Sequence, residues 1–217
     1  MIALYAADIR LLAPQFNTLI SFMDSERLQR VLQFGNTDSG LRCLAAGLLL
    51  RHVFGKTENT QFRLNLRGKP YRIDGQPFNL THTGDYTVLA TADATVGVDL
   101  ERIRPLDFTR VANRYFHPGE VHYLMQSEKT AETFFTLWTL KESYLKAEGS
   151  GFAKSPSENC ILPEGVDGAR FYGDAPYHFK RYHPFPGYCL SVCSLDSNFP
   201  ETVQLIRFSD EEAAPPR

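Results

Sequence analysis

The stretch between residues 60 and 101 most constrains the fold, because apolar and polar residues alternate there in short runs separated by turn signals. Alternation with a period of two is typical of half-buried β-strands, and Asp74-Gly75 is a turn signal. The runs are Phe62–Leu66, Phe78–Gly84, Tyr86–Thr91 and Val96–Glu101. The stretch therefore predicts several short antiparallel strands.

Helical patterns lie on both sides of these strands. Five apolar residues between Leu41 and Leu49 follow the 3.6-residue period and predict a helix from Gly40 to Phe54, with Thr37-Asp38-Ser39 as a cap. A long helix is expected from Thr130 to Ala147, stopping at Gly149. Short strand-like runs follow up to residue 208. We therefore expect a two-lobed α+β fold, with lobes at 1–97 and 98–209 and a disordered tail at 210–217.

Composition excludes several classes of protein. The 217 residues are 43% hydrophobic and 22% charged, and no apolar run approaches the length of a membrane span. The N-terminus lacks a basic region and predicts a strand, so we expect a cytoplasmic protein and no membrane association. The four cysteines show no CxxC spacing, which favours reduced, structural thiols over a zinc site.

Charge is distributed unevenly along the chain. Residues 1–75 carry a net charge of +4 and the remainder −6, which gives the total of −2. An anionic ligand is therefore expected to contact mainly the first third, and a metal ion the rest. The basic excess is too dispersed to predict nucleic-acid binding.

Asp99 and Glu101 are candidate metal ligands. On a strand they project to the same side, with Cα atoms about 6.5–7 Å apart. The ordinary interpretation is two carboxylates on a solvated strand face. Against it, acidic residues are poor strand formers and like charges this close repel. Mg²⁺ would relieve that repulsion and suits a few carboxylates with a substrate diphosphate. The two interpretations are evenly balanced.

The long helix carries Glu142 and Lys146 one turn apart, which by itself is most often a surface ion pair. Lys141 falls among the apolar positions of that helix, so its ammonium group must reach water or an anion. Arg42 lies near the start of the helix at 40–54, where backbone N–H groups favour an anion, although a solvated arginine is the commoner outcome.

Thr81 and His82 add a hydroxyl and an imidazole that could contact phosphate oxygens, although a lone histidine is more often an ordinary packed or surface residue. The chain contains no Gly-x-Ser-x-Gly elbow, no Gly-x-x-x-x-Gly-Lys phosphate loop and no Gly-x-Gly-x-x-Gly motif. The residues thus indicate a Mg²⁺-dependent enzyme acting on a diphosphate or nucleotide.

Three blocks in order resemble the Sfp-type 4′-phosphopantetheinyl transferases. They are Gly68-Lys69-Pro70 with Phe78-Asn79-Leu80-Thr81-His82-Thr83, then Gly97-Val98-Asp99-Leu100-Glu101, then Trp138-Thr139-Leu140-Lys141-Glu142-Ser143-Tyr144-Leu145-Lys146. With Arg42 upstream, the resemblance covers roughly residues 1–205. It implies two similar α+β lobes related by a pseudo-twofold axis, with coenzyme A bound between them and a monomer as the working unit.

The resemblance also implies the activity. Such enzymes transfer 4′-phosphopantetheine from coenzyme A to a serine of an acyl, peptidyl or aryl carrier protein and release adenosine 3′,5′-bisphosphate. Asp99, Glu101 and Glu142 would hold Mg²⁺, with Mn²⁺ as the alternative ion. Asp99, Glu142 and Lys146 would be catalytic, with Glu142 as the candidate base.

Coenzyme A itself would contact a second set of residues by resemblance. Lys146 and His82 would meet phosphate oxygens, Thr81 the nucleotide-diphosphate region, Lys69 the adenine and Arg42 the 3′-phosphate. The family usually has Ser where this chain has Thr81. Two upstream lysines of the family have no clear match, although Arg27 and Arg30 share their spacing with an offset of one position.

The carrier protein is expected to dock on the segment Pro105–Met125. Carrier proteins are commonly acidic near their serine, so Arg110 and Arg114, with Phe108 and Tyr115, are the expected contacts. Two alternatives to transfer are a Mg²⁺-dependent nucleotide diphosphate hydrolase and a carrier-binding module without catalysis.

Overall fold

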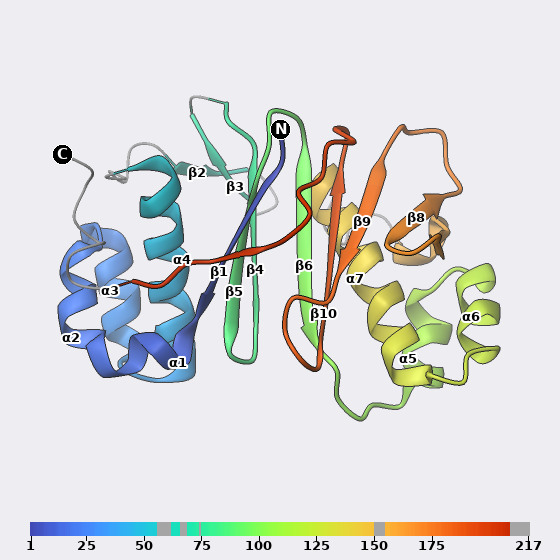
Figure 1. The fold of residues 1–217 in the computed structure, drawn as a ribbon, viewed down its shortest axis with the longest axis horizontal. Helices are drawn as coiled ribbons and strands as arrows, with labels where there is room; N and C mark the ends of the chain where they lie inside the picture. Colours follow the sequence, from blue (N-terminus) through green and yellow to red (C-terminus); the bar gives the residue numbers. More distant parts are fainter. Residues whose placement is uncertain (56–61, 66–68, 74, 150–154, 209–217) are drawn as a thin grey trace.

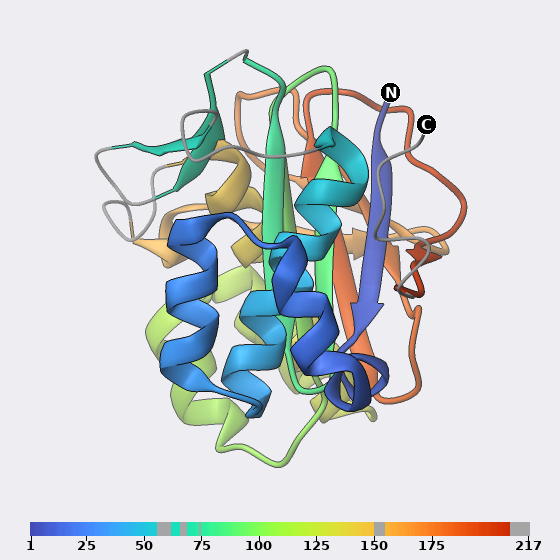
Figure 2. The same cartoon turned by 90° about the vertical axis from the view of Figure 1, so that its left-hand side faces the viewer.

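The computed structural model describes residues 1–55, 62–65, 69–73, 75–149 and 155–208 (Figure 1). Two sheets stand next to each other in the centre, and helices cover their outer sides (Figures 1 and 2). The prediction of an α+β fold with short antiparallel sheets and packed helices is confirmed.

The N-terminal lobe begins with a strand, continues with helices and ends with strands. The elements are β1 (Ala3–Asp8), α1 (Ile9–Leu12), α2 (Phe16–Leu19), α3 (Ser25–Phe34), α4 (Asp38–Phe54), β2 (Phe62–Leu64), β3 (Pro70–Arg72), β4 (Phe78–Thr83) and β5 (Tyr86–Thr91). Asp24 caps α3 and Thr37 caps α4, each by accepting a backbone N–H. The four-stranded sheet has the order β11-β1-β5-β4.

The C-terminal lobe repeats this order of elements. They are β6 (Val96–Arg102), α5 (Phe108–Tyr115), α6 (Pro118–Met125), α7 (Thr130–Glu148), β7 (Ile161–Glu164), β8 (Gly168–Phe171), β9 (His178–Tyr182) and β10 (Tyr188–Ser194). Its sheet has the order β6-β10-β9-β8-β7. Strands β6, β10 and β9 thus correspond to β1, β5 and β4. The chain then returns through β11 (Gln204–Leu205), which pairs in parallel with β1.

The strand register shows which residues of the two lobes correspond. Tyr86 opens β5 and pairs with the end of β1, and Tyr188 opens β10 and pairs with the end of β6. When these two tyrosines are matched, Tyr5 of β1 corresponds to Asp99 of β6. Both tyrosines lie in the apolar cluster between the sheets, which supports the match.

The two sheets also meet through side chains at the edge where β4 lies beside β6 (Figure 1). The backbone N–H of Val98 donates to Asn79 Oδ1 at 2.9 Å, and that of Leu100 donates to Thr81 Oγ1 at 3.3 Å. Side chains of β4 therefore satisfy edge N–H groups of β6 that would otherwise be buried without a partner. This junction positions β6, the strand that carries Asp99.

Helix α7 lies directly on β6 at Gly97. A Cβ atom at this position would overlap the backbone of Ser143 and Ala147, so only glycine permits so close an approach. The helix ends at Gly149, which has a φ of 72° in the left-handed region. Gly97 thus brings the C-terminal half of α7 against the strand.

Several local predictions were wrong. No helix was expected between residues 9 and 22, where α1, α2 and two 3₁₀ turns form, because these helices are too short to show a period. Between the predicted strands at 62–66 and 78–84, Pro70–Arg72 forms a further strand, β3, which pairs with β2. The lobe bounds 1–97 and 98–209 stay predictions, with their junction inside β6. The tail at 210–217 and Gly68 lie outside the described residues.

Candidate active site

Asp99 and Lys146 meet at the centre of the candidate site. Lys146 Nζ lies 2.6 Å from Asp99 Oδ1 and also donates to the Val98 carbonyl at 3.2 Å. Asp99 is 5% exposed, and Thr81 Oγ1 donates to the same Oδ1 at 3.3 Å. Asp99 Oδ2 is buried without a hydrogen-bond partner. An unpartnered carboxylate oxygen in a buried position is costly, which marks this atom as a candidate ligand-binding group.

Burial disfavours the ionisation of all three carboxyl groups of the site. Burial, followed by the charges of Asp99 and Glu142, raises the pKa of Glu101 to about 7. Burial and the charge of Asp99 raise the pKa of Glu142. Burial raises the pKa of Asp99 itself, although Lys146 opposes this. Clustered carboxyl groups with raised pKa values are typical of a site that binds a cation.

The described residues do not form a ready-made metal centre. Among them, no group of three His, Cys, Asp or Glu side chains is close enough to hold a metal ion. In this arrangement the ion-pair partner of Asp99 is Lys146. The chemistry of the donor set nonetheless fits a hard cation, since all three side chains supply carboxylate oxygens and Asp99 Oδ2 is unpartnered.

Arg42 and His82 lie on the N-terminal side of the site. Arg42, on α4, donates from Nη1 to the Gly84 carbonyl in the turn after β4, at 2.9 Å. Desolvation, followed by the charges of Arg42 and Lys146, lowers the pKa of His82. The charges of Arg42 and Lys146 thus both act on His82, and we refer to these three residues as the basic border of the site.

Lys69 and Thr81 are already engaged with protein groups. The Lys69 ammonium donates to the carbonyl of Lys146 in the last turn of α7, and burial lowers the pKa of Lys69. A cation at a helix C-terminus is a favourable arrangement. Thr81 is 6% exposed, and its hydroxyl bridges Leu100 and Asp99. Both residues link the N-terminal lobe to the elements that carry the site.

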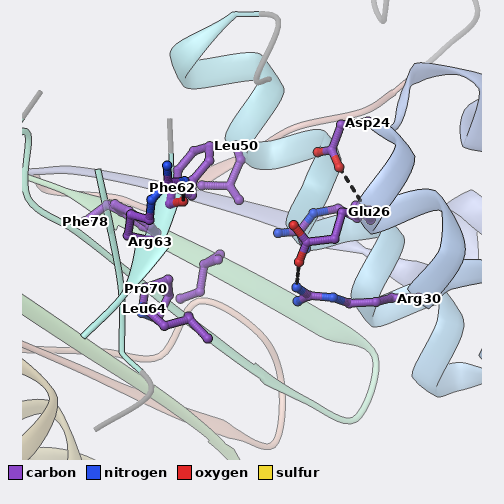
Figure 3. A pocket seen from close by; sticks show the side chains of 11 residues that line it. Asp24, Glu26, Arg30, Leu50, Phe62, Arg63, Leu64, Pro70 and Phe78 are labelled. Atoms are coloured by element: carbon purple, nitrogen blue, oxygen red, sulfur yellow. Dashed lines mark hydrogen bonds and ion pairs between the residues drawn. The ribbon is translucent and has the colours of Figure 1, made fainter. Parts of the chain in front are cut away.

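A cavity of about 300 Å³ opens between α3, the β2–β3 hairpin and β4 (Figure 3). Three arginines, Arg27, Arg30 and Arg63, contribute to its lining together with the rings of Phe62 and Phe78. Arg30 pairs with Glu26 in the same helix (Figure 3). Arg27 packs across Gly47 of α4, where a side chain would overlap it. The cavity therefore combines three arginines and two carboxylates, Asp24 and Glu26, with an aromatic wall.

Comparison with known proteins decides the family. Residues 95–193 match the 4′-phosphopantetheinyl transferase superfamily. The chain is 32% identical to the 4′-phosphopantetheinyl transferase gsp of Aneurinibacillus migulanus, over 84% of this chain and 81% of that protein. The chain belongs to the 4′-phosphopantetheinyl transferase family.

Other members of the 4′-phosphopantetheinyl transferase family give the same picture. The chain is 30% identical to psf-1 of Bacillus pumilus, over 88% of this chain and 87% of that protein, and 26% identical to Sfp of Bacillus subtilis, over 88% and 90%. Among solved structures, the holo-[acyl-carrier-protein] synthase of Thermotoga maritima matches 48% of this chain and 64% of that chain, at 18% identity and a TM-score of 0.41.

Two buried residues near the site were missed by sequence reasoning. Asn79 holds the edge of β6, and its signal was the alternation that places it on the same strand face as Thr81. Glu120 is fully buried and pairs with Lys141 at 2.9 Å. The place of Lys141 among apolar positions required water or an anion, and nothing in the sequence indicated that the partner would be Glu120.

Proposed function

We propose that this chain transfers the 4′-phosphopantetheine group of coenzyme A to a serine of an apo carrier protein, with release of adenosine 3′,5′-bisphosphate. One observation carries the proposal beyond family membership. Asp99, buried beside the lobe junction, is held by Lys146 and Thr81 and keeps Oδ2 unpartnered. An acidic group of this kind beside a lysine suits a diphosphate bound with a cation.

In this reaction the serine oxygen bonds to the phosphorus of the pantetheine phosphate, and the bond from that phosphorus to the bisphosphate oxygen breaks. Asp99, Glu101 and Glu142 would hold Mg²⁺, or Mn²⁺ instead, which supplies positive charge to the diphosphate when bound. Lys146 binds the phosphate oxygens and stabilises the charge of the departing bisphosphate. Glu142 would accept the serine proton as the general base.

The nucleotide end of coenzyme A would contact the N-terminal lobe. Arg42 binds the 3′-phosphate and His82 binds a phosphate oxygen, since both belong to the basic border. Arg27 and Arg30 of the same lobe line the cavity between α3 and β4 together with Asp24 and Glu26. Lys69 contributes by contact with α7 as well as by its proposed place near the adenine.

The carrier protein would dock on α5 and the strand end before it. Arg102, Arg104, Arg110 and Arg114 are all exposed there, and Asp107 is the one acidic residue between the first and last of them. Such a surface complements an acidic partner. Phe108 and Tyr115 were expected to contact the carrier, but their rings pack against Phe134 and Trp138 in the lobe core.

The working unit is proposed to be a cytoplasmic monomer. In the described part of the chain, no helix is long and apolar enough to cross a membrane. Size-exclusion chromatography with light scattering would test the monomer.

One assay separates transfer from its two alternatives. The protein is incubated with coenzyme A, Mg²⁺ and an apo carrier protein, and the carrier is weighed by mass spectrometry. A phosphopantetheine adduct that requires all three components supports the proposal. Release of bisphosphate without an adduct would indicate a diphosphate hydrolase, and carrier binding without either product would indicate a non-catalytic module.

A further inference from the structure

A buried ion pair lies one residue away from Glu142 in α7. Lys141 Nζ lies 2.9 Å from Glu120 Oε2, and their side chains are 3% and 0% exposed. The remaining bonds of the ammonium go to the carbonyls of Pro156 and Asn159, each at 2.7 Å. Lys141 therefore has a full set of three acceptors.

Glu120 is equally well bonded. Its Oε2 also accepts the backbone N–H of His117 at 2.8 Å, as part of the capping box that starts α6. Its Oε1 accepts the backbone N–H of Ile161, at the start of β7, at 2.8 Å. The pair thus connects the first turn of α6, the middle of α7 and the segment 156–161. We name this set of contacts the Glu120–Lys141 network.

Stability alone does not account for such a network. The charges of a buried pair lose their hydration, and replacement by well-packed apolar side chains is often neutral or stabilising. Burial opposes ionisation on both sides, since it raises the pKa of Glu120 and lowers that of Lys141, while each group's charge favours ionisation of the other. Apolar packing cannot replace the directionality of the network, because its hydrogen bonds fix the orientation of the elements that they join.

The site needs directional control of α7. Gly97 lets the helix approach β6 closely, and the Lys146–Asp99 pair and the Thr139–Ser191 hydrogen bond hold it to the sheet on that side. Lys141 is fixed from another side, and it precedes Glu142 by one residue, or about 100° and 1.5 Å along the helix. Fixing Lys141 therefore also fixes where Glu142 points relative to Asp99.

We propose that Glu120 and Lys141 are positioning residues for the transfer reaction, which set the rotation and axial position of α7 so that Glu142 and Lys146 face Asp99. The proposal rests on the function proposed above. A displacement of reacting groups by about 1 Å can cost roughly a hundredfold in rate. The network acts on the chemical step, so its loss lowers kcat and leaves binding of coenzyme A nearly unchanged.

The decisive variant replaces both partners at once, Lys141→Met with Glu120→Leu. Removal of both charges avoids the unpaired buried charge that either single change would leave. We expect a lower Tm with a cooperative transition, because the backbone groups bonded to the pair lose their partners. The KM for coenzyme A should stay within about threefold, and kcat should fall about tenfold to a hundredfold. The matched control is Lys129→Ala with Glu132→Ala, an exposed ion pair at 3.5 Å near the start of α7, which should leave all three quantities unchanged.

Two results would overturn the proposal. A double variant with a kcat within twofold of the wild type would show that apolar packing positions α7 equally well. Loss of the cooperative unfolding transition in the double variant would show that the network serves stability alone. Failure of the wild type to modify a carrier protein would instead reject the proposed function, so the two hypotheses fail on different measurements.

Discussion

Strands β1 and β6 occupy corresponding places in the two lobes, but their residues differ in kind. Where β6 carries Asp99, β1 carries Tyr5. The helices agree with this match when they are counted back from their terminal glycines, Gly55 and Gly149. His52 of α4 then corresponds to Lys146 of α7.

The paired residues make different contacts. Tyr5 and His52 meet edge to face, with ring centroids 5.8 Å apart, whereas Asp99 and Lys146 form an ion pair at 2.6 Å. By the same count Leu48, buried in the core of the N-terminal lobe, corresponds to Glu142. The same arrangement of strand and helix is therefore present in both lobes. In the C-terminal lobe, carboxylates with raised pKa values occupy positions that hold aromatic and aliphatic side chains in the N-terminal lobe. Carboxylates that are unfavourable for folding and occur in only one of two similar lobes are typical of a functional site.

The largest effect should come from Asp99→Ala, with Tyr5→Phe as its counterpart. Loss of the carboxylate removes a proposed cation ligand and the partner of Lys146, so we expect kcat/KM to fall by at least about a thousandfold. The Tyr5 variant keeps its ring and should stay within twofold. Carrier modification followed by mass spectrometry, with Tm as the check on folding, measures both. Equal losses of kcat/KM in the two variants would show that the two lobes do not differ in function at these positions.

Lys146→Met should come next, with a loss of about a hundredfold in kcat because positive charge beside the diphosphate disappears. This variant also leaves Asp99 buried without its cation, so Tm should fall. His52→Phe, the counterpart, preserves an aromatic contact with Tyr5 and should change neither quantity appreciably. Steady-state kinetics and thermal unfolding provide the comparison, and an unchanged kcat for the Lys146 variant would remove it from the mechanism.

Arg42→Ala is expected to raise the KM for coenzyme A about tenfold and leave kcat within twofold, since Arg42 would bind the nucleotide end and not the reacting phosphorus. Thr136 stands as many residues before Gly149 as Arg42 stands before Gly55. Thr136→Ala should alter neither constant. If kcat fell while KM stayed constant, Arg42 would act on the chemical step.

The smallest effect concerns pH. The pKa of Glu101 is raised to about 7 in the folded chain from an ordinary value of 4.5, so the folded state holds this proton more tightly than the unfolded state. Its contribution to the free energy of unfolding is present below about pH 4.5 and is lost as the pH rises through about 7. Without divalent metal, the wild type should therefore lose about 1–3 °C more in Tm between pH 5 and pH 8 than Glu101→Gln. Parallel curves for the two proteins would contradict the pKa shift.

The fold was predictable where a local pattern reports directly on structure. The alternation over 78–101 predicted strands β4 to β6, and Thr37 and Gly149 marked helix ends that the structure contains. The short helices before Met23 were missed because a single turn has no period to detect.

The site was less accessible to sequence reasoning. Asp99 and Glu101 were candidate ligands from their spacing on a strand, and Glu142 and Lys146 gained their roles by resemblance, whereas the ion pair between Asp99 and Lys146 depends on two elements meeting in space. Glu120 shows the same limit, because Lys141 was expected to reach water or an anion and long-range packing determines that the partner is Glu120. The contacts of Lys69 and Thr81 could not be predicted from the sequence either, because both residues bond to elements of the other lobe.

The most direct test of whether the C-terminal lobe holds the cation is the binding of Mn²⁺. It is measured by electron paramagnetic resonance with coenzyme A present and no carrier protein. The account predicts one Mn²⁺ bound per wild-type chain, at least tenfold weaker binding to Asp99→Ala, and wild-type binding to Tyr5→Phe. Equal Mn²⁺ affinity in the wild type and the Asp99 variant would contradict it.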